Sequence, residues 1–168
     1  MGAVRGLLEE GTFHESTVEE VARRAGVSRA SLYQHFGSRL GLVDAMCETF
    51  DRNPALVALR HTDDLDELVE RVVDFWAAEE PILVQLYGVA AVDPAARALV
   101  ERQGRDRQSE LKRVLRAAGI EGLESFAALS LLTSFETFQE LRRRVGLSKR
   151  EVVRQLQEAA RRLVRANS

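Results

Sequence analysis

The stretch from Thr17 to Phe36 constrains the fold of this chain more than any other part of the sequence. It reads TVEEVARRAGVSRASLYQHF, and it holds two residues that can cap a helix, Thr17 and Ser28. Glu20 follows Thr17 at the spacing of a capping box. Gly26 stands where a left-handed backbone conformation ends a helix. Two short helices joined by such a turn predict a helix-turn-helix, whose second helix can lie in the DNA major groove.

The apolar residues of this stretch recur at helical spacing, which indicates the buried face of each helix. We expect Val27 to be a buried plug in the turn between the helices. The other side chains expected to face inward are Val18, Val21, Ala22, Ala25, Leu32 and Phe36.

The side chains expected to face outward on the second helix suit nucleic-acid recognition. They are Arg29, Ala30, Ser31, Tyr33, Gln34 and His35. An Arg side chain binds the edge of guanine with two hydrogen bonds, a Gln binds adenine, a Ser binds either kind of base, and an Ala packs against the thymine methyl group. Tyr33, His35 and Thr17 suit contacts with phosphate.

The distribution of charge supports the same interpretation, although the total charge does not. The chain has 24 Lys and Arg residues against 26 Asp and Glu residues, so its formal net charge is -2. Between Glu20 and Asp44, however, the sequence has no acidic residue. The basic residues from this region are Arg23, Arg24, Arg29 and Arg39. We therefore expect a local surface that attracts phosphate.

Four segments form an ordered series of motif positions. They are TVEEVA from Thr17, AGVS from Ala25, LYQHF from Leu32 and GSRLGL from Gly37. This series resembles the DNA-binding signature of the tetracycline-repressor (TetR) family and covers about the first third of the chain. The family usually has Lys where Arg39 stands, so the resemblance implies a phosphate contact there. We expect a further phosphate contact at Ser28. Gly41 is expected to weaken the start of the following helix.

The rest of the sequence predicts helices and no strands. A helix from Ser38 to about Asp51 follows the motif, and in the TetR family this helix links the DNA-binding head to the body. We predict an all-α fold with a helix-turn-helix DNA-binding domain over residues 1–51 and a helical effector-binding and dimerisation domain over residues 52–168. The body helices are expected at 63–79, in a short helix that begins at Pro81, at 94–118 with a kink at Gly104, at 123–145 and at 148–166.

The last two predicted helices carry more apolar surface than one partner covers. Two such helices from each of two subunits would form a four-helix bundle, and the family resemblance implies the same homodimer. The alternative is that both helices complete the core of a monomer. The interface residues that we predict are Phe126, Ser130, Phe135, Val152, Leu156, Ala159, Ala160 and Leu163.

Aromatic and aliphatic residues of the middle helices are candidates for an effector pocket. They are Phe75, Trp76, Leu83, Leu86, Tyr87, Phe126, Leu129 and Phe138. The resemblance implies a pocket in this region, which would bind a small apolar or amphipathic molecule. The alternative is plain core, because an aromatic stripe at helical spacing usually packs inside a protein.

Other kinds of site find little support in the sequence. The one cysteine, Cys47, is expected to be a packing residue. The three histidines form no ligand pair for a metal, and no phosphate loop or nucleophile motif appears. No apolar run reaches the roughly 20 residues of a membrane span. We therefore expect a cytoplasmic protein without cofactor, metal, catalytic residues or membrane contact.

These observations predict a sequence-specific transcriptional regulator. The expected partners are double-stranded DNA, a second copy of the chain and an unidentified small effector, and the expected action is that of a ligand-responsive repressor bound as a homodimer to a palindromic operator. A second hypothesis is a helical interaction module, in which the helix-turn-helix only packs the head. An enzyme is the third, but no convergent acid, base and nucleophile supports it.

Overall fold

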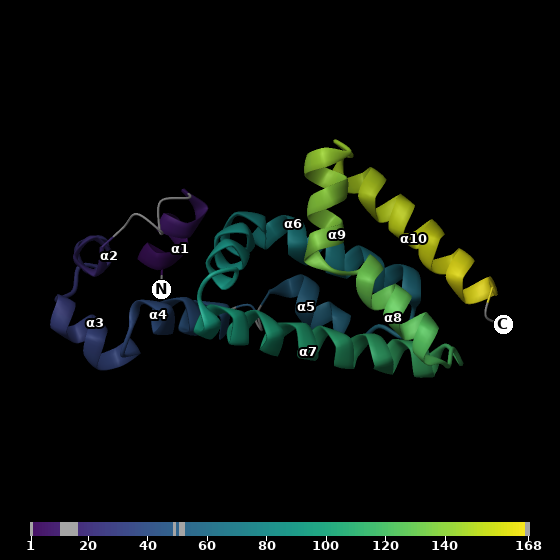
Figure 1. Cartoon of the computed structure of the whole chain (residues 1–168), viewed down its shortest axis with the longest axis horizontal. Coiled ribbons are helices and arrows are strands. Elements are labelled where there is room, and N and C mark those ends of the chain that lie inside the picture. Colours follow the sequence, from purple (N-terminus) through teal and green to yellow (C-terminus); the bar gives the residue numbers. More distant parts are fainter. Residues whose placement is uncertain (1, 11–16, 49, 51–52, 167–168) are drawn as a thin grey trace. The chain divides into compact units, whose positions relative to one another are not determined.

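The computed structural model of the chain describes residues 2–10, 17–48, 50 and 53–166, with the backbone alone for Leu8, Glu9, Arg39, Leu40, Met46 and Ala166. Every regular element among these residues is a helix (Figure 1). The predicted all-α fold is therefore confirmed. None of the helices within these ranges combines the length and the apolar character that a membrane span requires.

Two compact units divide the chain. The first, here called the head unit, comprises Met1–Arg52 and Glu79–Gln103, and the second, the body unit, comprises Asn53–Ala78 and Gly104–Ser168. The domain boundary that we predicted after residue 51 assigns residues 79–103 to the body, whereas they pack within the head unit. Two long helices, α6 (Leu65–Ala90) and α7 (Pro94–Ala117), each contribute one part to each unit.

The N-terminal helices of the head unit are short and pack around a small core. They are α1 (Gly2–Glu9), α2 (Val18–Ala25), α3 (Arg29–Phe36) and α4 (Arg39–Cys47). Helices α1 and α3 each pack against both α2 and α4. The buried side chains that they share are Val4, Leu7, Val21, Leu32, Leu42 and Val43. This packing holds α3 with one face inward and the other exposed.

The body unit combines the first part of α6 and the second part of α7 with further helices. They are α5 (Pro54–Leu59), α8 (Leu123–Leu132), α9 (Phe135–Gln139), the π-helix η2 (Glu140–Arg144) and α10 (Lys149–Ala166). Helix α10 packs against α8 and η2. It begins with a capping box, because the Glu151 carboxylate accepts from the Ser148 backbone N–H at 2.8 Å and the Glu151 N–H donates to Ser148 Oγ at 3.3 Å.

The single helix predicted over residues 123–145 is wrong, because the structure has α8, α9 and η2 there. The break lies at Thr133 and Ser134, where side-chain hydroxyl groups form hydrogen bonds with the backbone instead of the regular helix pattern continuing. Ser134 Oγ accepts from the Thr137 N–H at 3.2 Å and caps α9. Thr133 Oγ1 donates to the Leu129 carbonyl at 2.8 Å.

The short helix predicted to begin at Pro81 is also wrong, since α6 continues through this residue. A proline inside a helix removes one hydrogen bond and costs about 3 kcal/mol. Buried side chains compensate on both sides of it: Trp76 precedes Pro81, and Ile82 and Leu83 follow it with 0 % and 1 % exposure. Packing therefore overrides the local signal.

Candidate nucleic-acid interface

The first helix of the helix-turn-helix begins and ends as the motif predicts. The Glu20 backbone N–H donates to Thr17 Oγ1 at 3.2 Å, which caps α2. Gly26 has φ 67° and ψ 29°, a left-handed conformation that suits glycine. The Val27 N–H donates to the Ala22 carbonyl at 3.0 Å and closes the turn.

The prediction that Val27 is buried is wrong, because 46 % of this residue is exposed. Backbone hydrogen bonds hold the turn, so a buried side chain is not needed there. Ala25 is exposed as well, whereas Val21, Ala22 and Leu32 are buried as expected.

The recognition helix α3 has its own cap. The Ser31 N–H donates to Ser28 Oγ at 3.1 Å, and the hydroxyl groups of Ser28 and Ser31 lie 2.9 Å apart. Both serines therefore form hydrogen bonds within the free protein. Their hydroxyl groups can still take part in DNA contacts, because a hydroxyl carries one donor and two acceptor positions.

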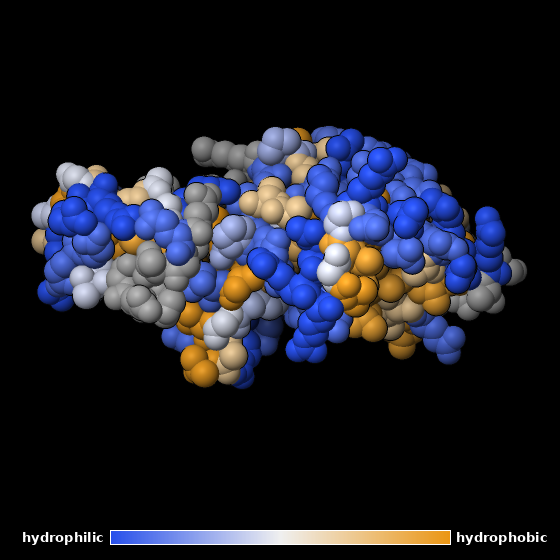
Figure 2. Space-filling view, turned by 90° about the horizontal axis from the view of Figure 1, so that it is seen from above, coloured by the Kyte–Doolittle hydropathy of each residue, from blue (hydrophilic) through white to orange (hydrophobic). Residues whose placement is uncertain are grey.

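All the predicted DNA-contacting side chains that the structure describes are exposed. They are Thr17, Ser28, Arg29, Ala30, Ser31, Tyr33, Gln34 and His35. The side chain of Arg39 lies outside the described part of the chain. The region that holds α2 and α3 is predominantly hydrophilic on the face seen in Figure 2. Leu32 anchors α3 from its buried side, so most of the predicted contacts lie on the exposed face of α3.

Carboxylates offset part of the positive charge that the sequence predicts near the motif. Glu20 binds Arg23 at 2.6 Å and Arg24 at 3.0 Å, and Arg24 also binds Glu10 at 2.8 Å. Hydrogen bonds from Arg23 and then from Arg24 lower the pKa of the Glu20 carboxyl from 4.5 to about 2. The stretch after Glu20 has no acidic residue, but the surface is less positive than this stretch suggests. The reason is that carboxylates earlier in the sequence pair with its Arg side chains.

Arg29, the first residue of α3, lies between two side chains of the head. Its Nη1 forms an ion pair with Glu19 of α2. Its guanidinium carbon lies 5.4 Å from the centre of the Tyr33 ring, one helical turn further along α3. The pairing with Glu19 was not predicted, although opposite charges at positions 19 and 29 are visible in the sequence.

Comparison with known proteins identifies the family of this domain. Residues 2–46 match the family described as "Bacterial regulatory proteins, tetR family". These residues are similar to the DNA-binding domain of transcriptional regulators of the TetR family. No curated protein matches the chain. The matched residues cover α1 to α3 and most of α4, the same region in which the sequence motifs occur.

The residues predicted to line an effector pocket fall into both units. Leu83 and Leu86 are buried in the head unit, where Tyr87 is half-buried. The residues that belong to the body unit are Phe75, Trp76, Phe126, Leu129 and Phe138. All of these except the half-buried Phe126 are buried.

The aromatic residues of the body unit pack against one another. The ring of Trp76 lies 5.1 Å from Phe75 and 5.5 Å from Phe135, and Phe135 stacks on Phe138 at 6.1 Å. The indole N–H of Trp76 donates to the Thr133 carbonyl at 3.1 Å. These contacts agree with the alternative that the aromatic stripe is core.

A polar group that sequence reasoning did not select lies in the same unit. Arg107 of α7 donates to the Ser130 carbonyl at 3.0 Å and to Thr133 Oγ1 at 2.8 Å. The Ser130 hydroxyl is buried and has no hydrogen-bond partner in the structure. Arg107 has no motif around it, so only the fold shows that it reaches the break between α8 and α9.

The predicted dimer residues divide into two groups. Val152, Leu156 and Ala160 of α10, together with Phe135, are buried within the chain itself. Phe126, Ser130, Ala159 and Leu163 remain half-buried. Two residues outside the predicted set are far more exposed, namely Leu123 at 80 % and Leu131 at 68 %.

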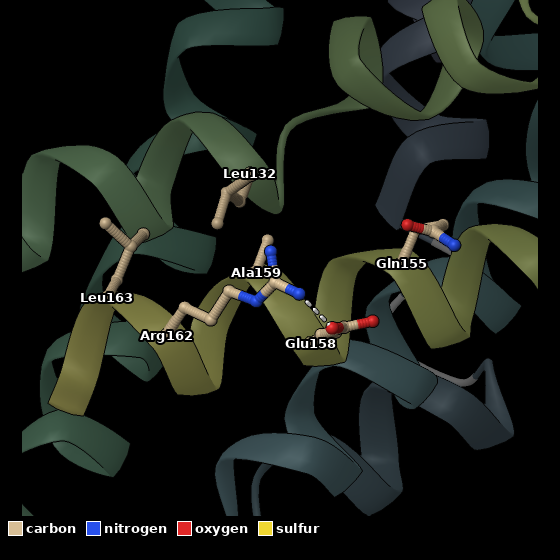
Figure 3. A pocket seen from close by; sticks show the side chains of 6 residues that line it. All are labelled: Leu132, Gln155, Glu158, Ala159, Arg162 and Leu163. Carbon is tan, nitrogen blue, oxygen red and sulfur yellow. Dashed lines mark hydrogen bonds and ion pairs between the residues drawn. The ribbon is translucent and has the colours of Figure 1, made fainter.

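An open groove of about 420 Å³ lies between α8 and α10 (Figure 3). Leu132 of α8 faces Ala159 and Leu163 of α10 across it, and the polar side chains of the lining are those of Gln155, Glu158 and Arg162. Arg162 forms an ion pair with Glu158. The groove therefore has an apolar side and a charged side.

Cys47 of α4 is buried, and burial raises the pKa of its thiol to about 11. A thiol of this kind is protonated at neutral pH and reacts slowly, which fits the predicted packing role. Among the described residues, no group of His, Cys, Asp and Glu side chains is arranged to hold a metal ion.

Proposed function

We propose that this regulator is a cytoplasmic, ligand-responsive repressor that binds a palindromic operator as a homodimer. The observation that carries the proposal is the exposed face of α3, held by the Ser28 cap at its start and by buried Leu32 on its inner side. In helix-turn-helix proteins, the N-terminal residues of the recognition helix contact base edges. Arg29 and Ser31 occupy those positions.

The side chains of α3 divide into two roles in this proposal. Arg29, Ser31 and Gln34 contact base edges, and Ala30 packs against a thymine methyl group. The residues assigned to phosphate groups are Thr17, Ser28, Tyr33, His35 and Arg39. Thr17 and Ser28 also cap the two helices, which places the N-termini of α2 and α3 beside the proposed phosphate contacts.

The exposed apolar side of α8 supports the homodimer. Leu123 and Leu131 lie two helical turns apart on α8, with exposed Ala127 between them. Large apolar side chains that are exposed in such a row commonly mark an interface. The space-filling view shows apolar side chains gathered among the helices at the right of the picture (Figure 2). A dimer would give two recognition helices, which bind half-sites about 34–36 Å apart.

A route for ligand response follows from the two shared helices. Helices α6 and α7 run from the body unit into the head unit. Within the head unit, Glu79 of α6 forms an ion pair with Arg5 of α1 at 2.8 Å, and Arg102 of α7 pairs with Asp44 of α4. An effector that binds one arrangement of α6 and α7 more tightly than another would therefore change α1 and α4.

The proposed effector is a small apolar or amphipathic molecule bound in the body unit. The support is Trp76, which lies against Phe75 and donates to the Thr133 carbonyl, together with Arg107, which donates to Thr133 Oγ1. A binding site of this composition provides apolar contact area and a few groups that fix orientation.

The second candidate function, an interaction module without specific DNA binding, is favoured by one observation. The cations that precede and begin α3 are paired with carboxylates: Arg23 and Arg24 with Glu20, and Arg29 with Glu19. Paired cations attract phosphate less strongly than free ones. Measurements on variants of Arg29 and Arg39 distinguish the two functions.

We predict that Arg29→Ala weakens operator binding by about 1–3 kcal/mol, because one base contact is lost, and relaxes the sequence preference at that symmetric base pair. Arg39→Ala is expected to weaken all duplexes about equally, because a phosphate contact carries no sequence information. Fluorescence anisotropy with the operator, single-base variants of it and a random duplex measures both effects at one fixed salt concentration. Equal losses on all duplexes for both variants would contradict this division of roles.

A further inference from the structure

We propose that Glu19 is a specificity-determining residue that positions the Arg29 guanidinium for guanine and weakens the attraction of that guanidinium for phosphate. Glu19 is exposed on α2, outside the recognition helix, and is not among the residues assigned to DNA contact above. The inference rests on the proposed role of Arg29 in base recognition.

The geometry restricts the Arg29 guanidinium from two sides. Glu19 binds Nη1, and the Tyr33 ring lies 5.4 Å from the guanidinium carbon. Glu19 belongs to α2 and Tyr33 to α3, and the capped turn fixes these two helices relative to each other. A long Arg side chain has many accessible rotamers, and fixing it in one of them costs entropy. Two contacts that limit its rotamers in the free protein reduce the entropy that DNA binding must remove.

The chemistry of the guanidinium allows Glu19 to remain bound while Arg29 contacts a base. The group has five N–H donors in a planar fork, and the ion pair engages Nη1. The other donors remain for the two acceptors of guanine, N7 and O6. Glu19 then orients the fork without replacing the base.

The same carboxylate opposes contacts that do not depend on sequence. A phosphate has no base edge to offer, so it must compete with Glu19 for the charge of Arg29. The paired side chains are exposed, with 59 % of Arg29 and 54 % of Glu19 accessible. An exposed ion pair is weak in itself, so its effect is expected in selectivity and salt dependence rather than in stability.

The test uses Glu19→Gln, which keeps the size and the acceptor oxygen of the side chain and removes its charge. On a random duplex, we expect tighter binding, and a slope of log K against log salt that is steeper by about 0.9 for each recognition helix in contact. The ratio of operator to random affinity should fall by about fivefold or more, the lower end of the discrimination of one bidentate contact. Circular dichroism should show unchanged unfolding.

Two further variants separate this effect from a change in total charge. Glu48→Gln removes the same charge from an exposed position of the head unit, and we expect at most a small change in slope. In the Arg29→Ala background, Glu19→Gln should have no effect on the slope, because the residue acts through Arg29. A steeper slope in that background, or an equal effect of Glu48→Gln, would overturn the proposal.

The random-duplex arm needs no operator, so it tests Glu19 independently of the proposed function. If no operator is found but the slopes change as described, the pairing of Glu19 and Arg29 stands and base recognition by Arg29 fails. If an operator is found and Glu19→Gln leaves slope and ratio unchanged, the inference about Glu19 is wrong while the proposed function stands.

Discussion

Gly41 allows α4 to start close to the preceding helix. A Cβ atom at this position would clash with the Phe36 carbonyl oxygen, which belongs to the backbone. The Gly41 N–H donates to Ser38 Oγ at 3.0 Å, so the residue also belongs to the cap of the helix. The sequence suggested that Gly41 weakens this helix start, but its missing side chain is what the close approach requires.

We therefore predict that Gly41→Ala destabilises the protein by about 1–3 kcal/mol, the range of overpacked sites. Thermal unfolding followed by circular dichroism measures this change. Gly6→Ala in α1 is a suitable control, because no atom lies within 4 Å of a Cβ built there. An unchanged midpoint for Gly41→Ala would show that α4 does not approach Phe36 this closely.

Gly104 in helix α7 differs from Gly41, because no close approach requires a missing side chain there. We expected a kink at Gly104, yet α7 runs without interruption from Pro94 to Ala117. No atom lies within 4 Å of a Cβ at Gly104. Gly104→Ala should therefore stabilise the protein by about 0.5–1 kcal/mol, because alanine loses less backbone entropy in a helix.

Gly26→Ala provides the matched comparison for Gly104→Ala. Space is free at Gly26 too, but its φ is +67°, so alanine there should cost about 1–2 kcal/mol. Chemical denaturation of both variants measures whether each substitution raises or lowers the free energy of unfolding. Destabilisation by Gly104→Ala would indicate that α7 bends at this residue in solution.

Local signals predicted the helix-turn-helix and its caps, whereas tertiary packing determined the rest. The roles of Thr17, Gly26 and Ser28 depend only on near neighbours in sequence, so the motif shows them directly. The continuity of α6 through Pro81 depends on buried side chains on either side of it. The pairing of Glu19 with Arg29 depends on how α2 and α3 are oriented, which the sequence does not specify by itself.

At the scale of the whole molecule, the exposed side of α8 should join two copies of the chain. We predict that Leu131→Glu weakens dimerisation by about tenfold or more, because a charge would be buried without a partner. Sedimentation velocity over a range of concentrations measures this. Leu131 is 68 % exposed in the single chain, so the fold itself should tolerate the change.

Val92→Glu is the control for Leu131→Glu. Val92 is 83 % exposed and belongs to the head unit, away from the predicted dimer residues in sequence. This variant should sediment as the native protein does. If both variants behave alike, or if the native protein is a monomer at every concentration, α8 and α10 do not form the dimer interface.

The measurement that tests the central claim most directly is selection from a library of random DNA duplexes at one stated salt concentration. A dimer with two α3 helices predicts an enriched palindrome whose half-sites are separated by one turn of DNA, about 10–10.5 base pairs. Arg29→Ala, selected in parallel, should lose the preference at one symmetric position. Enrichment of no sequence, or of one without symmetry, would contradict the account of a dimeric regulator that recognises its operator through α3.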